Sequence, residues 1–233
     1  QRISSLTGSG KLRYEVLVRM ADEQGNPVSP GAFLPPAERF GMAHLIDRWV
    51  IEHVCATLSG SPRHLAGLEA CHINISGRSF DHEDFLDFVV GLFDRYPVSP
   101  EKICFEFTET AAVRYLSDVR AFMERLGGLG CTFALDDFGS GVSSFGYLRQ
   151  LPVELLKIDG AFVRNIATDD TDRAMVRAIT DIGKTLGKTI VAEFVEDDAA
   201  LEVLRELGVD YGQGFGIHYP SRLPAFIDLE RVG

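Results

Sequence analysis

The sequence predicts an α/β protein built as a parallel barrel of the (β/α)8 type. Short segments with the residue types of strands alternate along the chain with longer segments whose apolar residues recur at helical spacing. The chain is 233 residues long, and no shift in composition marks a linker that would divide it. We therefore expect residues 1–233 to form a single domain, of a size that suits a (β/α)8 barrel.

The chain opens with a predicted β-hairpin, whose strands cover residues 1–6 and 11–20 around the turn Thr7–Gly10. A proline-rich loop leads to a helix predicted over residues 36–58, because apolar residues recur there at helical spacing. Those apolar positions are Leu45, Ile46, Trp49, Val50 and Val54. The further predicted strands cover residues 71–76, 103–108, 132–136, 153–158, 189–192 and 209–212. The further helices are predicted over residues 79–96, 116–129, 171–186, 199–207 and 224–232.

Composition narrows the possible partners and the compartment. The net charge of −11 argues against a DNA or RNA duplex, and against an anionic membrane surface, as a general partner. No apolar run approaches the roughly 18 residues that a membrane span needs. The cysteines are widely spaced in apolar segments without a CxxC pair, which predicts reduced core thiols of a cytoplasmic protein. They are Cys55, Cys71, Cys104 and Cys131.

The stretch Thr132–Gly141, TFALDDFGSG, is unusual for a purely structural segment. An apolar strand delivers two adjacent acids, Asp136 and Asp137, and then turns on glycine. Carboxylates at the end of a buried strand are costly unless they are paired or bind a metal. The alternative is an aspartate that caps a helix before a glycine turn. If the site interpretation holds, the glycine turn would let two consecutive side chains face one site, which the alternation of a regular strand forbids.

Polar side chains also follow the other predicted strands. The residues at the strand ends are Asn74, Glu106, Asp136, Asp137, Lys157, Glu193 and Gln213, and the second arm of the hairpin adds Glu15 and Arg19. Each has a structural explanation when taken singly, such as Asn74 as a helix cap. Because active sites of barrels lie at the C-terminal ends of the strands, the repetition over successive strands predicts a functional site there.

The residue types at this site suit a hard divalent cation. Carboxylate and amide oxygens, without cysteine or a histidine pair, favour Mg²⁺ or Mn²⁺ over zinc. Five carboxylates exceed what one Mg²⁺ usually takes, so we expect two cations that share a bridging aspartate and support phosphoryl chemistry. The chain has no GxGxxG, GxSxG or P-loop motif. His72 and His218 could lie near the site, although a core or surface position is favoured for both histidines.

Several ordered motifs then resemble one known family. Glu15–Arg19 resembles ExLxR, Phe33–Glu38 resembles FIPxAE, Asn74–Ser76 matches NxS, and Phe105–Glu109 matches FExTE. Asp136–Gly141 matches DDFG[TS]G, Lys157–Asp159 matches KID, Ala192–Glu196 resembles AEGVE, and Gln213–Phe215 resembles QGY. Gln1–Ile3 is similar to the QPI of the first strand. On these motifs the chain resembles the EAL domain, the phosphodiesterase of the bacterial second messenger cyclic di-GMP. The departures are Arg2 for Pro, Val16 for Ala, Phe194 for Gly and Tyr219 for Arg.

The resemblance implies a fold and a metal site. The fold is a modified (β/α)8 barrel with one antiparallel strand near the N-terminus. One Mg²⁺ or Mn²⁺ ion would be held by Glu15, Asn74, Glu106 and Asp136, and a second by Asp136, Asp137 and Glu193. The catalytic residues implied are Glu193 as general base, Lys157 to orient the attacking water, and Asp137.

The resemblance also implies how the substrate is held. Arg19 would bind a phosphate, and Leu17 would line the groove for the dinucleotide. Gln1 and Gln213 would complete the substrate-binding set. Supporting positions behind the site would be held by Glu109, Asp159 and Glu196.

The implied reaction is hydrolysis of cyclic di-GMP to linear pGpG, and the alternative is a catalytically silent receptor that binds cyclic di-GMP. The family's habits predict a homodimer, with the helix and loop after Lys157 as the first candidate surface. Because the chain starts within its first strand, we expect a fragment of a longer signalling protein with upstream sensory or GGDEF-type domains. Its location would be the cytoplasm, or the cytoplasmic part of a membrane-anchored protein.

Overall fold

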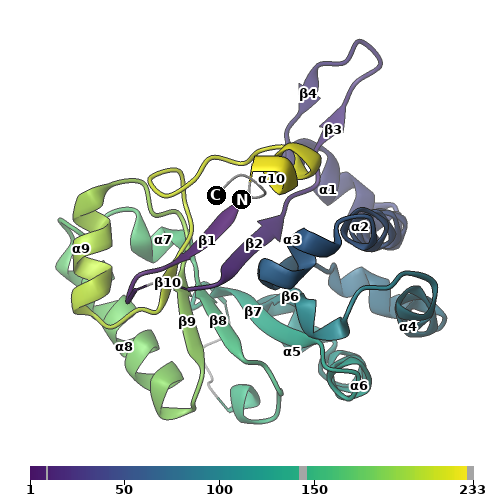
Figure 1. The fold of residues 1–233 in the computed structure, drawn as a ribbon. Helices are drawn as coiled ribbons and strands as arrows, with labels where there is room; N and C mark the ends of the chain where they lie inside the picture. The colour runs from purple at the N-terminus through teal and green to yellow at the C-terminus, as the bar shows by residue number, and fades with distance from the viewer. Residues whose placement is uncertain (9, 142–145, 230–233) are drawn as a thin grey trace.

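A computed structural model describes residues 1–8, 10–141 and 146–229 of the chain. Eight strands close into a barrel in the order β1-β10-β9-β8-β7-β6-β5-β2 (Figure 1). They are β1 (Arg2–Ser5), β2 (Leu12–Val16), β5 (Leu68–Asn74), β6 (Ile103–Thr108), β7 (Thr132–Phe138), β8 (Leu155–Ile158), β9 (Thr189–Ala192) and β10 (Tyr211–Gly212). The predicted barrel is therefore confirmed.

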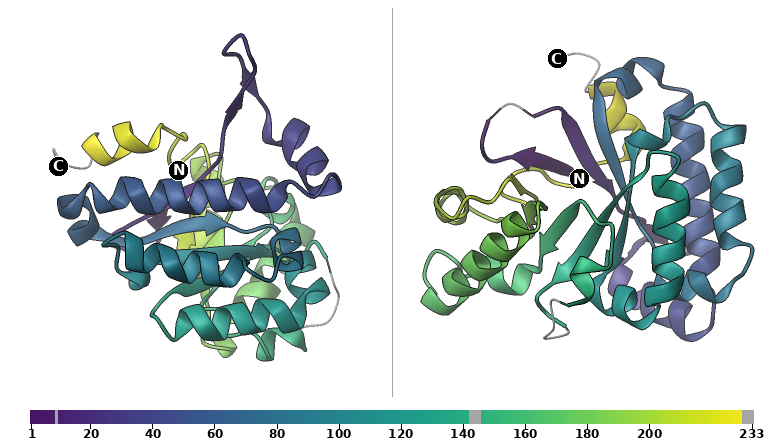
Figure 2. Two further views of the ribbon diagram at one scale, coloured as in Figure 1. Left: turned by 90° about the vertical axis from the view of Figure 1, so that its right-hand side faces the viewer. Right: turned by 90° about the horizontal axis from the view of Figure 1, so that it is seen from below.

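The antiparallel strand is β1. It runs antiparallel to both of its neighbours, β2 and β10, whereas the other neighbouring strands of the barrel pair in parallel. The predicted N-terminal hairpin is confirmed, but its second arm is shorter than expected and ends at Val16. Beyond it, β3 (Met20–Ala21) and β4 (Pro27–Val28) pair with each other as a separate ribbon that projects from the barrel (Figure 2, left).

The helices pack around the outside of the barrel (Figure 2, right). They are α1 (Pro30–Arg39), α2 (Ala43–Ser59), α3 (Pro62–Gly67), α4 (Phe85–Arg95), α5 (Glu109–Arg114), α6 (Leu116–Gly127), α7 (Gly160–Val163), α8 (Asp170–Thr185), α9 (Asp198–Glu206) and α10 (Leu223–Leu229). Short 3-10 turns are η1 (Gly77–Asp81), η2 (Pro100–Lys102) and η3 (Tyr147–Arg149). The predicted end of the last helix, at residues 230–232, lies outside the described residues.

The single helix predicted over residues 36–58 is wrong. Two helices occupy this region, α1 and α2, and they meet at Gly41, whose φ of +68° a helix does not tolerate. The buried face of α2 also differs from the predicted one. Leu45 and Trp49 are 52% and 59% exposed, whereas Ile51 and Leu58 belong to the core. An apolar residue at helical spacing was therefore no proof of burial.

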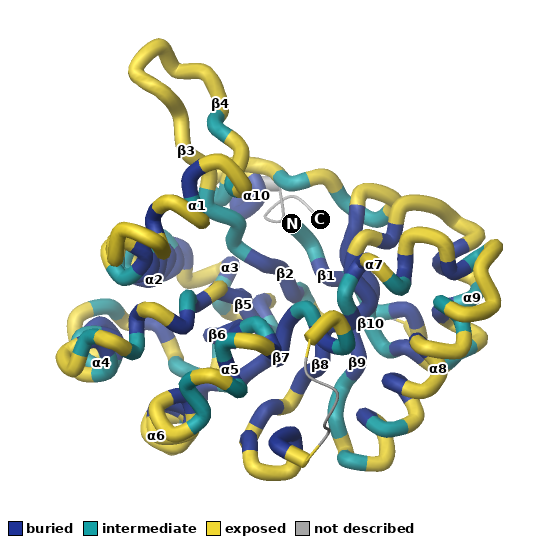
Figure 3. Tube along the Cα trace, turned by 180° about the vertical axis from the view of Figure 1, so that it is seen from behind, coloured by how far each residue is buried: buried dark blue, intermediate teal, exposed yellow. Residues whose placement is uncertain are grey.

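The strands and the facing sides of the helices form the main core, and most barrel strands are buried while the outer helical turns are exposed (Figure 3). The described cysteines are all buried and unpaired, as predicted. Among the described residues, no helix combines the length and hydropathy that a membrane span requires.

A second, smaller apolar cluster fills one level of the barrel interior. It consists of Ile3, Ala70, Cys104, Ala134, Leu155 and Val191. Because side chains alternate between the two faces of a strand, the residue two positions later on each parallel strand faces the interior again. Those residues are His72, Glu106, Asp136, Lys157 and Glu193, and all of them are buried. On the antiparallel β1 the direction reverses, and Gln1 stands two positions before Ile3. The apolar level is thus the floor of a polar site.

Candidate active site

Lys157 lies at the centre of the site. Its side chain is completely buried at the end of β8, and its Nζ contacts a carboxylate from each of four other parts of the barrel. The carboxylate oxygens lie 2.8 Å (Glu106), 2.9 Å (Glu193), 3.2 Å (Asp136) and 3.3 Å (Glu15) from Nζ. The structure therefore brings together acids that are far apart in the sequence. One ammonium group cannot compensate the charge of four carboxylates.

The pKa values follow from this imbalance. Burial alone lowers the pKa of Lys157, but the attraction of Asp136, Glu106 and the other acids outweighs it and leaves the pKa well above its usual range. Burial raises the pKa of Glu193 well above its ordinary value, and Asp136 adds to this rise while Lys157 opposes it. The site accordingly holds Lys157 charged and resists full ionisation of its acids.

Glu15 is the acid that is best stabilised as a carboxylate. Burial raises its pKa, but Lys157 and side-chain donors from Gln213 and Asn74 reverse the shift and lower the pKa below normal. Asn74 Nδ2 donates to Oε1, and Gln213 Nε2 donates to Oε2 at 2.6 Å. Gln213 also donates to Gln1 Oε1 at 3.1 Å, and the main-chain nitrogen of Gln1 donates to the carbonyl of Glu15 at 2.8 Å. These contacts close the ring of polar residues across the β1–β10 side of the barrel.

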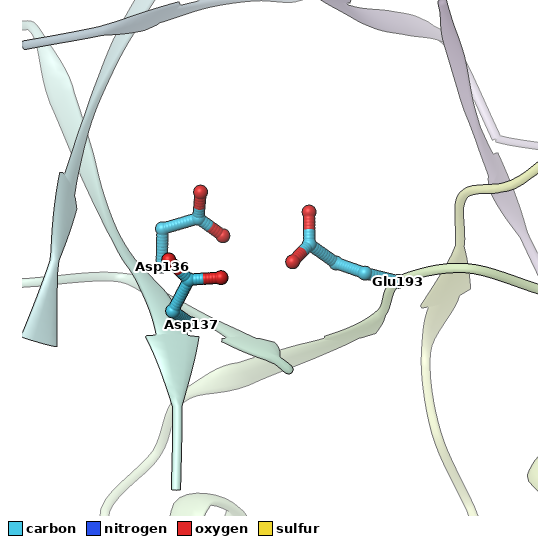
Figure 4. Close-up of side chains that lie close together, drawn as sticks. All are labelled: Asp136, Asp137 and Glu193. Atoms are coloured by element: carbon cyan, nitrogen blue, oxygen red, sulfur yellow. The ribbon is translucent and has the colours of Figure 1, made fainter. Parts of the chain in front are cut away.

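Asp136, Asp137 and Glu193 form the group best placed for a cation. One carboxylate oxygen from each lies within 4.8 Å of the others (Figure 4). The two consecutive aspartates face one site because the register of β7 shifts between Leu135 and Phe138, and Asp137 adopts a left-handed φ of +52°. The predicted reason, the glycine turn, is wrong, since the regular alternation is already broken at Asp137, inside β7 and before Gly139. Burial and the neighbouring charge of Asp136 raise the pKa of Asp137 to about 6.

The residues fit divalent cations. Asp136 Oδ1 is buried, and it forms no hydrogen bond with any described residue although Lys157 lies near it. The contact with Lys157 Nζ at 3.2 Å is an ion pair without hydrogen-bond geometry, so a bound ion or water would satisfy this buried oxygen further. The donor set consists of carboxylate and amide oxygens, which suits Mg²⁺ or Mn²⁺. The excess negative charge around Lys157 and the buried Oδ1 of Asp136 thus form an environment that suits a cation.

The predicted supporting residues occupy different places. Glu109 is buried under the loop that follows β7, where its carboxylate accepts from the amide of Gly139 at 3.1 Å and from the Tyr147 hydroxyl at 2.6 Å. Asp159 caps α7 by accepting from the amide of Ala161 at 2.8 Å. Glu196 is exposed and lies at the wall of a cavity beside Glu193.

The predicted substrate-binding residues line that cavity, which has a volume of about 220 Å³. It is lined by Gln1, Glu15, Leu17, Arg19, Glu193, Phe194, Glu196, Gln213, Gly214, Phe215 and Pro220. Phe194 has a left-handed φ of +53°, is 46% exposed, and lies under the guanidinium of Arg164 at 4.4 Å. The cationic side chain of Arg19 and the aromatic side chains of Phe194 and Phe215 thus line one cavity that also contacts Glu193.

Two buried polar groups were missed or undervalued in the sequence. His72 is completely buried and contacts Glu106, so the favoured core-or-surface interpretation was too weak and the alternative, a position near the site, describes it. Its spacing of two residues from Asn74 on one strand was the available signal. Asp47 on α2 accepts from the amide of Ser76 at 2.8 Å and from the Ser79 hydroxyl at 2.6 Å. It holds the turn that follows Asn74, and its position inside an apolar helix gave no indication of this partner.

Asp47 should make stability depend on pH. Burial raises its pKa to about 7. Because this is above the unfolded value of about 3.9, the folded state loses stability as pH rises from about 4 to about 7. Asp47→Asn keeps an oxygen that can accept both bonds, so the variant should be more stable by as much as ~4 kcal/mol at pH 8 and equal to the wild type near pH 4. Urea unfolding across this range measures the difference. Exposed Asp94→Asn should run parallel to the wild type, and a parallel Asp47→Asn curve would contradict the buried charge.

The comparison with known proteins agrees with this geometry. The family model described as "EAL domain" matches residues 1–220. Cyclic di-GMP phosphodiesterase PdeB of Shewanella oneidensis is 37% identical over 229 residues, which cover 98% of this chain and 27% of that relative. Cyclic di-GMP phosphodiesterase PdeF of Escherichia coli is 36% identical over 216 residues, which cover 92% of this chain and 28% of that relative. The chain thus spans less than a third of these curated relatives.

Solved structures show the same fold. The PaMucR phosphodiesterase in its complex with cyclic di-GMP superposes with a TM-score of 0.89 at 33% identity, over 97% of this chain and 92% of that one. The FimX EAL domain from Pseudomonas aeruginosa bound to cyclic di-GMP gives a TM-score of 0.86 at 28% identity, over 95% and 88% of the two chains. With the barrel, the ordered motifs and the family match in agreement, this chain belongs to the EAL domain family.

Proposed function

We propose that this domain is a metal-dependent phosphodiesterase that hydrolyses cyclic di-GMP to linear pGpG. The observation that carries the proposal is the convergence of four carboxylates on Lys157, next to a cavity with a phosphate-binding candidate. Relatives named cyclic di-GMP phosphodiesterases support the substrate. So do related structures that contain cyclic di-GMP.

The chain's own residues would divide the work as follows. Glu15, Asn74, Glu106 and Asp136 would hold one Mg²⁺ or Mn²⁺ ion, and Asp136 with Asp137 and Glu193 would hold the second. When bound, two such ions supply a nucleophilic water at neutral pH and neutralise the charge of the phosphate. Two such ions together with the ammonium group of Lys157 would balance the five carboxylates, so an anionic substrate could enter an acidic site.

Proton handling and substrate binding fall to the remaining residues. Glu193 would take the proton from the attacking water, and a raised pKa suits a carboxylate to this task. Lys157 would orient that water or stabilise the charge that develops on the phosphate. Arg19 would hold a phosphate with its guanidinium, and Leu17 would line the groove, both from the segment that leaves β2. Gln1 and Gln213 hold Glu15 between them and would complete the substrate side.

One assay tests this proposal. The purified domain is incubated with cyclic di-GMP in Mg²⁺ or Mn²⁺, and the products are separated by chromatography. We expect pGpG to form only when a divalent ion is present, and chelation to stop the reaction. Saturable binding of cyclic di-GMP without turnover in metal would contradict the enzyme and favour the receptor. The retention of all the implied metal ligands favours the enzyme over that alternative.

The setting of the domain is also a proposal. We propose that it acts as one 233-residue unit within a longer signalling protein, which its short coverage of the relatives supports. One related protein is named a bifunctional diguanylate cyclase/cyclic di-GMP phosphodiesterase, MucR of Pseudomonas aeruginosa. The homodimer, whose candidate surface is the segment after Lys157, the cytoplasmic location and the sensory or GGDEF-type neighbours stay predictions.

A further inference from the structure

A line of buried polar contacts runs through the barrel beneath the proposed metal site. Arg13 on β2, His72 on β5 and Glu106 on β6 occupy neighbouring strands. Arg13 Nη1 lies 3.0 Å from His72 Nε2, and His72 Nδ1 lies 2.5 Å from Glu106 Oε1. We propose that His72, held in one tautomer by Arg13, is a positioning residue that fixes which oxygen Glu106 presents to the site.

The tautomer follows from the donors. A guanidinium group can only donate hydrogen bonds, so His72 Nε2, which faces Arg13, has to accept. The ring proton then resides on Nδ1, where it is donated to the carboxylate of Glu106. The opposite tautomer would turn an N–H toward the guanidinium and a lone pair toward the carboxylate. Both contacts would become repulsive in the buried interior of the barrel.

Arg13 is itself held from two further sides. Its Nη2 donates to Glu69 Oε1 at 2.9 Å, and its guanidinium lies over the ring of Tyr211 at 5.2 Å. Glu69 is partly exposed, so the line of contacts begins at the outer edge of the barrel and ends at the site. Such an anchored guanidinium cannot turn away from His72 without breaking an ion pair.

As a consequence, the two carboxylate oxygens of Glu106 have different partners. Oε1 accepts from His72, and Oε2 accepts from Lys157 at 2.8 Å. With Oε1 engaged from below, Oε2 is the oxygen left to turn toward a cation. A ligand held by a second hydrogen bond is fixed in orientation, and loss of such an outer bond typically costs 10–100-fold in metal affinity.

The first test is made on the metal-free wild-type protein and needs neither a variant nor turnover. Ring ¹⁵N chemical shifts of His72, measured by NMR at pH 7.5, report which nitrogen carries the proton. We expect Nδ1 to be protonated and Nε2 to be bare. A proton on Nε2, alone or together with one on Nδ1, would overturn the proposal.

The second test measures Mn²⁺ binding by calorimetry in the absence of cyclic di-GMP. His72→Leu removes the donor and should lower Mn²⁺ affinity by about 10–100-fold. His72→Asn keeps an amide N–H at the place of Nδ1 and should remain within a few-fold of the wild type. The matched control is His64→Leu, which removes another buried histidine, on α3, whose Nε2 lies 3.0 Å from the Tyr14 hydroxyl. It should leave Mn²⁺ affinity unchanged.

The outcomes separate this inference from the proposed function, on which its catalytic meaning rests. Wild-type Mn²⁺ affinity in His72→Leu would overturn the positioning role. An equal loss in His72→Leu and His64→Leu would show a general effect of core damage and would overturn it as well. If both tests succeed but no pGpG forms, only the phosphodiesterase assignment fails.

Discussion

Replacing Asp136 with asparagine is expected to lower metal-dependent turnover of cyclic di-GMP by on the order of 10³-fold or more. Asp136 is the one residue assigned to both cations, and its Oδ1 is buried without a hydrogen bond among the described residues. The amide keeps the shape of the side chain but removes its charge and one of its two oxygens. Loss of several kcal/mol of electrostatic stabilisation corresponds to this reduction in rate. Steady-state kinetics at saturating Mn²⁺ measure the loss.

The same substitution should have the opposite effect on the stability of the metal-free protein. It removes one of the four carboxylates that compete for Lys157, so the free energy of unfolding in EDTA should stay equal or rise. The control Asp181→Asn, exposed on α8, should change neither property. Unchanged turnover in Asp136→Asn would mean that the bridging role is misassigned. A joint loss of turnover and metal-free stability would make Asp136 a structural residue.

Replacing Lys157 with methionine is expected to destabilise the metal-free protein by about 3–5 kcal/mol at pH 7.5. Methionine fills a similar volume, but it leaves four buried or nearly buried carboxylates without a counter-charge. Urea unfolding in EDTA measures the change. Lys184→Met is the matched control, because Lys184 pairs with Asp210 where both side chains are partly exposed. Surface pairs of this kind contribute about 1 kcal/mol or less.

Two conditions should restore stability to Lys157→Met. Mn²⁺ would supply the missing positive charge, and a lower pH would protonate the acids, so the difference from the wild type should shrink in both. Turnover should remain low even in saturating Mn²⁺, because the ammonium group that we propose to orient the attacking water is absent. A variant as stable as the wild type in EDTA would contradict the central place of Lys157. Full turnover in Mn²⁺ would remove its catalytic role.

The sequence was most informative where strands end. The strands Ile103–Thr108 and Thr189–Ala192 were predicted with their observed bounds, and the acids Glu106 and Glu193 lie in the site. The reason is that period-two alternation and barrel geometry together fix which face a residue occupies and at which end of the barrel it lies. Residues as distant as Glu15 and Gln213 could be assigned to one site on that ground.

Features that depend on a partner residue elsewhere in the fold, or on the local backbone torsions, could not be predicted from the sequence pattern. The Arg13–His72 contact joins strands 59 residues apart, and neither residue type alone indicates the other. The break at Gly41 depends on one backbone torsion within a continuous apolar pattern. Asp137 adopts a conformation that its residue type does not require, because a shift in strand register imposes it. Local pattern therefore placed the candidate ligands at one end of the barrel, whereas tertiary contacts decided how their side chains are held.

Closure of the barrel between β1 and β10 has a consequence for how the protein is made. Glu15 leaves the ribosome about 200 residues before its donor Gln213 and before β10, the strand that closes the barrel against β1. Until then, the nascent chain presents an open edge at β1, and unpaired edges of this kind invite pairing with other chains. Glu15 and Glu106 are also synthesised before Lys157, so they lack this counter-charge until β8 has been made. The site is therefore completed late in the synthesis of this domain. Chain termination before Tyr211 would leave the barrel open between β1 and β9, and the site would lack Gln213.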